Sequence, residues 1–346
     1  MCAGDAGGYA AFMVTDSTAR RRMARHRPRS DVSEGYAGTP ESGVRTVLVT
    51  GASGGIGRAT VRILLEEGFA VWAAVRDEAG RDALIADLGD RVGVVVFDVT
   101  DGPSVAEAAA VIDAQGPLYA LVNNAGAALP GPLEYVPIEQ FRRQLEINLV
   151  GQLRVTQALM PALRRGVDRW GDARIVLMGS MDGRIVGPLF GPYAASKHAL
   201  VGLADGLRSE LGPSGLKVVL LEPGAVATPI WRRGVSVLDE LQPALPDDGG
   251  PYRGVMNFAR RRIPWLSRLG ADPSGVGRAV CLALTAARPR PRRVVGVDAA
   301  IVTGALWVVP PRLIYRITSL PAVLSTASWR RAVRRSRRRH PTRTAD

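Results

Sequence analysis

The chain has few of the residues that build metal sites and disulfide frameworks. Its 346 residues include only two cysteines, Cys2 and Cys281, which lie far apart in the sequence. This scarcity excludes a disulfide-stapled fold and a zinc site made of cysteine pairs, and it fits a reducing compartment. The histidines are equally sparse and show no metal-ligand spacing: His26, His198 and His340. We therefore expect no metal site, and we expect His198 to be a surface or supporting residue.

Long apolar runs are also missing. The sequence has no uninterrupted stretch of about 20 apolar residues, so it predicts no membrane-spanning helix. Its apolar C-terminal segment, 301–327, is broken by prolines and arginines. Two interpretations of this segment remain open: it lies at a membrane interface, or it packs over the substrate cleft or against the domain. The side chains that would contact a membrane are Trp307, Leu313, Ile314 and Tyr315.

Lysine is nearly absent, because only two of the 45 basic residues are lysines, and arginine therefore carries the net charge of +13. Eight arginines lie in the C-terminal tail, 328–346, against a single acid, Asp346, so this tail holds more than half of the excess charge. An arginine run attracts anionic lipid or nucleic acid, but a solvated, disordered tail is the ordinary outcome. Because interleaved aromatics for base stacking are lacking, we expect no nucleic-acid partner.

The N-terminal part and the middle of the chain differ in pattern. Residues 1–43 are rich in Gly, Ala, Ser and Arg and lack the apolar core of a secretory signal, which predicts a disordered extension on a cytoplasmic protein. Residues 44–300 alternate between short β-branched runs and helical patterns. This alternation predicts an α/β fold, a single Rossmann-type doubly wound parallel sheet with helices on both faces.

A tyrosine and a lysine four residues apart carry the clearest chemical signal. Tyr193-Ala-Ala-Ser-Lys197 follows Gly191-Pro192, a plausible helix start, and residues four apart share a helix face. A lysine charge roughly 6 Å from the phenol, at an effective dielectric of about 20, would lower the phenol pKa by about two units. Such a phenol suits general acid–base work on an alcohol or ketone. Ser180 lies thirteen residues upstream.

A glycine-rich turn supplies the second signal. The strand-like run 44–50 leads into Gly51-Ala-Ser-Gly-Gly55-Ile-Gly57 and then into the helical stretch 58–67. Glycines allow close backbone approach and a helix N-terminus favours an anion, so this order predicts a dinucleotide phosphate site. The spacing differs from the commoner Gly-x-Gly-x-x-Gly, and a tight turn without a ligand would use the same residues.

Further motifs follow the other apolar strands. Asp98 ends the strand-like run 92–97, Asn123-Asn-Ala-Gly126 follows 118–122, and Pro223-Gly224 closes 216–222, with Thr228 soon after. Together with the two signals above, these motifs resemble the short-chain dehydrogenase/reductase family over about Arg45 to Ala300. The run 293–298 resembles the hydroxysteroid and retinol dehydrogenases of that family. One departure, a longer connection around 164–172, is interpreted as a surface-loop insertion.

The resemblance implies a role for each catalytic residue. Tyr193 would be the acid/base, and Lys197 would lower its pKa and bind the nicotinamide ribose. Ser180 would hold the substrate oxygen, and Asn148 would keep a helix open to a water that links Lys197 to solvent. Simpler alternatives stay open, because Ser180 could merely cap a turn and the Asn148 amide could be satisfied locally.

The end of the second strand, 69–75, points to NADP(H) rather than NAD(H). An NAD site needs an acid there, whereas an arginine accommodates the 2′-phosphate. Val75 occupies the position of the acid and Arg76 follows it, while Asp77 is interpreted as the start of the next helix. Arg58 is a possible further phosphate contact. The expected cofactor-binding residues are Gly51, Ser53, Gly55, Ile56, Gly57, Arg76, Asp98, Asn124, Ala125, Gly126, Tyr193, Lys197, Pro223, Gly224 and Thr228.

These observations predict an NADP(H)-dependent oxidoreductase that interconverts a secondary alcohol and a ketone or aldehyde. In the family, a segment such as 225–271 forms the lid, and its aromatic and aliphatic residues favour a lipophilic substrate such as a steroid, retinoid or long-chain carbonyl. The same residues, Leu238, Leu241 and Met256 among them, could instead simply pack the lid down. The alternatives are a 3-oxoacyl-thioester reductase that receives an acidic carrier at lid arginines, and a catalytically silent dinucleotide sensor. The resemblance also implies a homodimer or homotetramer through two long helices, 138–165 and 192–211.

Overall fold

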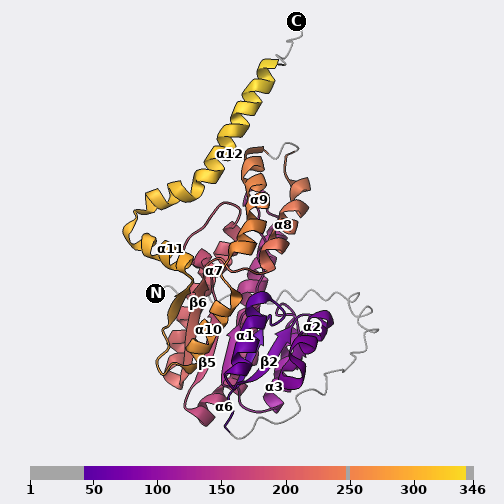
Figure 1. Cartoon of the computed structure of the whole chain (residues 1–346), viewed down its shortest axis with the longest axis vertical. Helices are drawn as coiled ribbons and strands as arrows, with labels where there is room; N and C mark the ends of the chain where they lie inside the picture. The colour runs from indigo at the N-terminus through magenta and orange to yellow at the C-terminus, as the bar shows by residue number, and fades with distance from the viewer. Residues whose placement is uncertain (1–42, 247–249, 340–346) are drawn as a thin grey trace, which may run out of the picture. The chain divides into compact units, whose positions relative to one another are not determined.

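A seven-stranded parallel sheet forms the centre of the molecule (Figure 1). The computed structural model describes residues 43–246 and 250–339, so the predicted extension lies outside the described residues except for Gly43. The strand order is β3-β2-β1-β4-β5-β6-β7. The strands are β1 (Thr46–Thr50), β2 (Ala70–Val75), β3 (Gly93–Val96), β4 (Ala120–Asn123), β5 (Ala173–Met178), β6 (Leu216–Pro223) and β7 (Arg292–Val295).

The inner strands are continuous apolar runs because helices cover both faces of the sheet. Every residue of β2, β4 and β5 is buried. Side chains alternate between the faces, so Val47 and Val49 of β1 pack on one side and Leu48 packs on the other. The order reverses between β1 and β4, which in this architecture is where a dinucleotide binds.

Helices lie on both faces of the sheet, so the predicted doubly wound fold is confirmed (Figure 1). One core contains residues of α1 (Gly55–Glu66), α2 (Glu78–Leu88) and α10 (Pro273–Thr285). The opposite core contains residues of α3 (Gly102–Ala114), α5 (Gly151–Ala158), α6 (Met160–Trp170) and α7 (Gly191–Leu211). Two short 3₁₀ turns, η2 (Gly89–Arg91) and η5 (Gly212–Ser214), follow α2 and α7.

The prediction of a surface-loop insertion at 164–172 is wrong. Most of this segment belongs to α6, whose Ala162 and Leu163 are fully buried against the sheet. The helix ends at Gly171, which adopts the left-handed conformation (φ 80°) that glycine tolerates best. The buried residues Ala162, Leu163 and Gly166 have the spacing of one helix face, so the signal was present in the sequence and the prediction overlooked it.

The predicted long helix 138–165 is interrupted. It consists of α4 (Ile138–Leu145), one π-helical turn, η3 (Glu146–Val150), then α5 and α6. Pro161 lies in the first turn of α6, where its missing N–H costs nothing, and it separates that helix from α5.

The predicted lid, 225–271, is built mainly from two helices, α8 (Ile230–Glu240) and α9 (Arg253–Leu269). Two 3₁₀ turns, η6 (Gln242–Ala244) and η7 (Gly250–Tyr252), lie between them. The lid has a hydrophobic core of its own, which includes Leu238, Met256 and Ile263. It is therefore a small packed layer and not an extended loop.

Two helices follow the sheet, α11 (Val297–Val308) and α12 (Pro311–Arg339). The helix α12 packs against α9 and η7 of the lid. It also runs through most of the segment predicted as a disordered tail, since arginine has a high helix propensity and the chain continues as helix past Pro321. Among the described residues, no helix combines the length and apolar character needed to cross a membrane.

Candidate active site

Tyr193, Lys197 and Ser180 come together where β5 ends beside α7. The helix α7 begins at Gly191 with Pro192 in its first turn, as predicted, and it places Tyr193 and Lys197 one turn apart. The Lys197 Nζ lies 5.6 Å from the centre of the Tyr193 ring. Ser180 follows β5 and hydrogen-bonds to the Tyr193 phenol. The chain thus holds a phenol, a hydroxyl and an ammonium in contact.

The structure reverses the expected direction of the Tyr193 pKa. Burial of the phenol raises this pKa above 10, and the negative charge of Asp182 raises it further. The hydrogen bond from Ser180 opposes both effects without cancelling them. The sequence estimate treated the pair as solvated, whereas a buried phenolate loses its hydration. Tyr193 is therefore held as a protonated phenol, which is the form that donates a proton.

Lys197 is a buried cation. Its Nζ donates a 2.7 Å hydrogen bond to the Met178 carbonyl oxygen at the end of β5, and its side chain is almost inaccessible to solvent. Burial lowers the pKa of Lys197 to about 8, and the charge of Asp182 partly offsets this effect. A lysine of this kind changes its protonation state near neutral pH more readily than a solvated one.

Asp182 is a site residue that the sequence interpretation missed. Its backbone N–H donates to Ser180 Oγ at 3.1 Å, and Ser180 Oγ lies 3.2 Å from its carboxylate Oδ2. Burial raises the pKa of Asp182, while Ser180, Lys197 and His198 oppose this rise. Ser180 thus caps the 3₁₀ turn η4 (Met181–Gly183), as the simpler interpretation held, and also contacts Tyr193. The signal was present in the sequence, since an acid stands two residues after Ser180.

We expect Asp182→Asn to lower the pKa of Tyr193, because the neutral amide removes a negative charge from beside the phenol. In the acid–base role that the sequence predicts for Tyr193, alcohol oxidation requires the phenolate, so its rate should rise at a lower pH than in the parent protein. The measurement is the pH profile of kcat/KM for oxidation of a secondary alcohol that the parent accepts. Glu139→Gln removes an exposed charge on α4 and serves as control. If Asp182→Asn does not shift the pH at which the oxidation rate rises, this electrostatic role of Asp182 is contradicted.

Asn148 lies in the π-helical turn between α4 and α5 and is fully buried. Its Oδ1 accepts from the Ala127 N–H at 2.9 Å, and its Nδ2 donates to the Ala127 carbonyl and to Ser196 Oγ. The amide is thus satisfied locally, as one interpretation held. The π turn is also the local opening of the helix that the other interpretation required, and such turns are frequent at functional sites.

The glycine turn forms a close backbone cradle at the start of α1. Gly51 has a φ of 65°, and a Cβ there would lie 2.9 Å from the Ala125 Cα. A Cβ on Gly57 would collide with the Gly51 carbonyl. The helix begins after Gly54, and no side chain caps its first N–H groups. These N–H groups and the small residues around them fit the pyrophosphate of a dinucleotide.

The Asn123–Gly126 loop is joined to this cradle by hydrogen bonds. Thr50 Oγ1 accepts from the backbone N–H groups of Asn124 and Ala125 at 3.0 and 2.9 Å. The Asn124 side chain donates back to the carbonyl oxygens of Thr50 and Gly51. The ends of β1 and β4, which flank the reversal of strand order, are therefore held as one unit.

Charged side chains gather where the adenosine end of a dinucleotide would lie. Arg76 follows β2 and pairs with Asp77 at 3.3 Å, with both side chains exposed. Asp77 is the N-cap of α2, which supports its interpretation as a helix start. The nearby charge of Arg233 in the lid helps to lower the pKa of Asp77, after the hydrogen bonds from Gly80 and Arg76. Arg58, expected near the phosphate, instead points to Asp87 of α2.

Other predicted cofactor residues lie close to the same edge. Asp98 follows β3, and its Oδ1 accepts from both the backbone and the hydroxyl of Thr100. Thr228 lies against the cradle, since a Cβ on Gly55 would be 3.0 Å from the Thr228 Cγ2. Ser53 lies beside Gly80 at the start of α2. The cofactor-binding roles of these residues stay predictions.

Two acids that the sequence interpretation did not identify fasten the Pro223–Ala225 loop. Asp298 of α11 accepts from the Ala225 N–H at 2.7 Å, and its carboxylate fills the space that a side chain on Gly224 would need. The preceding Glu222 is 1% exposed and forms a bidentate ion pair with Arg184, at 2.8 and 2.6 Å. This pair ties the turn after Ser180 to the end of β6.

The backbone just before α7 is strained. Leu189 has a φ of 73°, which is costly for a residue with a branched side chain, and it is buried in the lid core. Its carbonyl accepts a 2.8 Å hydrogen bond from the Gly131 N–H. Strain of this kind persists where the surroundings hold it, and it often accompanies functional sites. Leu189 lies two residues before the start of α7, so the strained residue directly precedes the helix that holds Tyr193 and Lys197.

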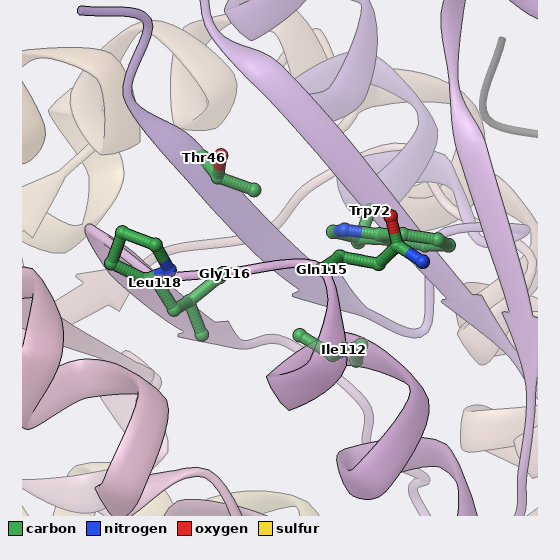
Figure 2. A pocket seen from close by; sticks show the side chains of 7 residues that line it. Thr46, Trp72, Ile112, Gln115, Gly116 and Leu118 are labelled. Carbon is green, nitrogen blue, oxygen red and sulfur yellow. The ribbon is translucent and has the colours of Figure 1, made fainter. Parts of the chain in front are cut away.

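A small pocket elsewhere in the domain is not the site (Figure 2). It lies at the first residue of β1 and at the connection from α3 to β4, where ligands do not normally bind in this architecture. Its lining residues are Thr46, Trp72, Ile112, Gln115, Gly116, Pro117 and Leu118.

Within the described ranges, no group of acids, histidines or cysteines could hold a metal ion. Cys281 is buried as a free thiol. His198 is exposed, and its Nδ1 contacts the Ala194 carbonyl of its own helix.

Comparison with known proteins matches this geometry to one family. The family model for short chain dehydrogenases matches residues 45–236. An NADPH-dependent 3-dehydrocapnine reductase from Ornithobacterium rhinotracheale is 31% identical, over 79% of this chain and 96% of its own length. Mouse retinol dehydrogenase 16 is 32% identical, over 74% of this chain and 81% of its own length. The crystal structure of a short chain dehydrogenase from Burkholderia cenocepacia in complex with NADP superposes with a TM-score of 0.60 at 25% identity, covering 79% of this chain and 96% of that one.

Proposed function

Since the chain belongs to the short-chain dehydrogenase family and is an oxidoreductase of alcohol and carbonyl groups, we propose that it uses NADP(H) on a lipophilic substrate. Tyr193 is the acid/base in this proposal. The observation that carries it is the contact of Tyr193, Ser180 and Lys197 beside the dinucleotide cradle. The retinol dehydrogenase relative agrees with the predicted resemblance.

The proposed chemistry divides between cofactor and protein. The nicotinamide supplies or accepts the hydride when it is bound. For reduction, the Tyr193 phenol donates its proton to the carbonyl oxygen, and its raised pKa keeps that proton in place at neutral pH. Ser180 donates a hydrogen bond that holds the same oxygen. Lys197 holds a positive charge beside the phenol and stabilises the phenolate that forms.

Preference for NADP(H) is assigned to Arg76. It is an exposed arginine directly after β2, where β2 offers Val75 and no acid. A relative named as NADPH-dependent and a similar structure that contains NADP support this assignment. The charge of the lid residue Arg233 helps to lower the pKa of Asp77, which follows Arg76, so Arg233 is a second candidate for binding the 2′-phosphate.

We expect Arg76→Glu to lower the affinity for NADPH by about tenfold or more relative to NADH. The substitution replaces a positively charged hydrogen-bond donor with a carboxylate, which repels the negative 2′-phosphate of NADPH. The measurement is the dissociation constant of each dinucleotide by fluorescence titration. Arg142→Glu changes an equally exposed arginine on α4 and should leave the ratio unaltered. An unaltered ratio in Arg76→Glu would refute the assignment.

The case for a lipophilic substrate now depends on fewer residues. Leu238, Leu241 and Met256, which the sequence interpretation assigned to the lid's apolar surface, are buried. Two other observations support an apolar ligand near Tyr193. Leu133 is 64% exposed and packs against Gly191, two residues from the catalytic tyrosine. The ring of Phe190, three residues before Tyr193, lies edge-on to the lid's Trp231 ring, with the ring centroids 6.1 Å apart.

The alternatives differ in what the site should do. A 3-oxoacyl-thioester reductase would dock an acidic carrier on lid arginines, one of which, Arg260, already pairs with Asp239. A silent sensor would bind a dinucleotide without turnover. Oxidation of NADPH with steroid, retinoid, aliphatic and 3-oxoacyl carbonyls separates these cases. Turnover of the first three supports the proposal, and turnover of thioesters alone, or none at all, rejects it.

A homodimer or homotetramer and a cytoplasmic location belong to the same proposal. In the family such assemblies form through the long helices beside the sheet, which here correspond to α4, α5 and α7. The molar mass measured by light scattering tests the assembly.

A further inference from the structure

The last two helices leave many apolar side chains uncovered. Trp307 is 84% exposed and Val308 is 81% exposed at the end of α11, and Tyr315 is 71% exposed near the start of α12. Isolated exposed apolar residues are ordinary, but many of them along two consecutive helices indicate an interaction surface. The other members of the group are Val297, Ile301, Leu313, Ile317, Leu320 and Val323.

On α12 these side chains form a stripe. Leu313, Ile317 and Leu320 are four and three residues apart, so they share one face of the helix. Ile314 and Thr318, one position further along, are half-buried, and the helix packs against α9 and η7 of the lid. One face of α12 is therefore occupied by the lid, and a second, apolar face points outward.

The charge of this region is uniformly positive. From Ala299 to Ala345 the sequence contains ten arginines and no aspartate or glutamate. Arg312 and Arg316 are exposed one position before Leu313 and Ile317, so positive charge borders the apolar stripe. Aromatic and aliphatic side chains bordered by arginines are the pattern of a helix that lies in a membrane interface. Each arginine near an anionic lipid surface adds to the attraction.

Other occupants fit this surface less well. A second copy of the chain would bring the same positive charge against itself, which is repulsive in a symmetric interface. Nucleic acid would satisfy the arginines but would leave Leu313, Ile317 and Leu320 without an apolar partner. A surface of anionic phospholipid satisfies both parts at once.

We propose that the outward faces of α11 and α12, defined by Trp307, Leu313, Tyr315, Ile317 and Leu320 with Arg312 and Arg316, dock on membranes that contain anionic phospholipid. The proposal is independent of the catalytic assignment, since it depends only on these two helices. Docking here places the lid, which α12 contacts, close to the lipid surface.

Sedimentation of the full-length protein with vesicles tests this docking. Vesicles of phosphatidylglycerol and phosphatidylcholine should pellet the protein, and vesicles of phosphatidylcholine alone should pellet much less of it. The binding should weaken at 0.5–1 M salt, roughly five-fold above an ordinary buffer, because salt screens exposed charges. Arg312→Gln with Arg316→Gln should weaken vesicle binding by about tenfold or more. Trp307→Ser with Ile317→Ser and Leu320→Ser should weaken it at least as much, because apolar burial is lost.

Matched controls use equally exposed residues on α4. Ile138→Ser and Arg142→Gln should pellet like the parent. NADPH binding, measured in solution, should be the same in all variants, which separates loss of docking from loss of folding or of catalysis. Equal pelleting with both vesicle types, or variants that pellet like the parent, would overturn the proposal. Tight binding of a DNA duplex without vesicle binding would also overturn it. The same holds if the protein is a dimer that the triple substitution converts to a monomer, while vesicles bind neither form.

Discussion

Replacing Tyr193 with phenylalanine is expected to lower kcat for carbonyl reduction by about 10²- to 10⁴-fold, the usual contribution of a positioned proton donor. The variant loses the phenolic hydroxyl that Ser180 contacts and keeps the ring beside Lys197. Cofactor affinity should change little, because the dinucleotide cradle is formed by Gly51, Gly57 and the loop at Asn124. Single-turnover kinetics with NADPH, together with a fluorescence titration of NADPH, measure the two quantities separately.

Tyr119→Phe is the matched control for this prediction. Tyr119 is a fully buried tyrosine at the start of β4, and its hydroxyl donates a 2.8 Å hydrogen bond to the Leu284 carbonyl. Removing that hydroxyl should lower the free energy of unfolding by about 1 kcal/mol and leave turnover intact. If Tyr193→Phe retained substantial turnover, another group would have to supply the proton, and Asp182 would be the first to examine.

Gly57→Ala is expected to disable cofactor binding. A Cβ at this position would collide with the Gly51 carbonyl oxygen and lie 2.8 Å from Asn124 Nδ2, so the turn cannot accept it without moving. Overpacking of this kind typically costs about 1–3 kcal/mol. Since the displaced atoms form the cradle, the affinity for NADPH should fall by about tenfold or more. The dissociation constant of NADPH and the thermal midpoint of unfolding report the two effects.

The same substitution at Gly202 provides the comparison. Gly202 lies inside α7, and a Cβ there would meet no atom within 4 Å. Alanine has a higher helix propensity than glycine, so Gly202→Ala should preserve NADPH binding and slightly raise stability. Unchanged NADPH affinity in Gly57→Ala would mean that the dinucleotide does not use this turn.

Much of the fold follows from local pattern. The strand-like runs 44–50, 69–75, 92–97, 118–122 and 216–222 agree with β1 to β4 and β6 within two residues at each end, because buried parallel strands are short apolar runs between turns. In α6, the interpretation of a longer connection took precedence over the helical spacing of the buried residues. The segment 164–172 therefore looked like an insertion, although Leu163 and Gly166 bury one side of α6.

The lid shows the opposite failure. Its apolar residues were correctly identified as a group, but the sequence could not say whether they faced a ligand or one another. In the structure Leu238 and Met256 face the lid's own core, whereas Phe190 and Leu133, from outside the lid, lie near Tyr193. The side to which each lid side chain points depends on how α8 and α9 pack, and the sequence pattern within either helix does not specify that packing.

The sequence alone determined the resemblance to the family, the alternation of strands and helices, the glycine turn and the one-turn spacing of Tyr193 and Lys197, since each motif is made of residues near one another in the chain. Tertiary structure decided which distant groups meet the site: Asp182 near Tyr193, Asp298 against Gly224, and Arg184 on Glu222. It also decided the direction of the Tyr193 pKa, because the free energy of a charge depends on how much water and which charges surround it, and folding sets both.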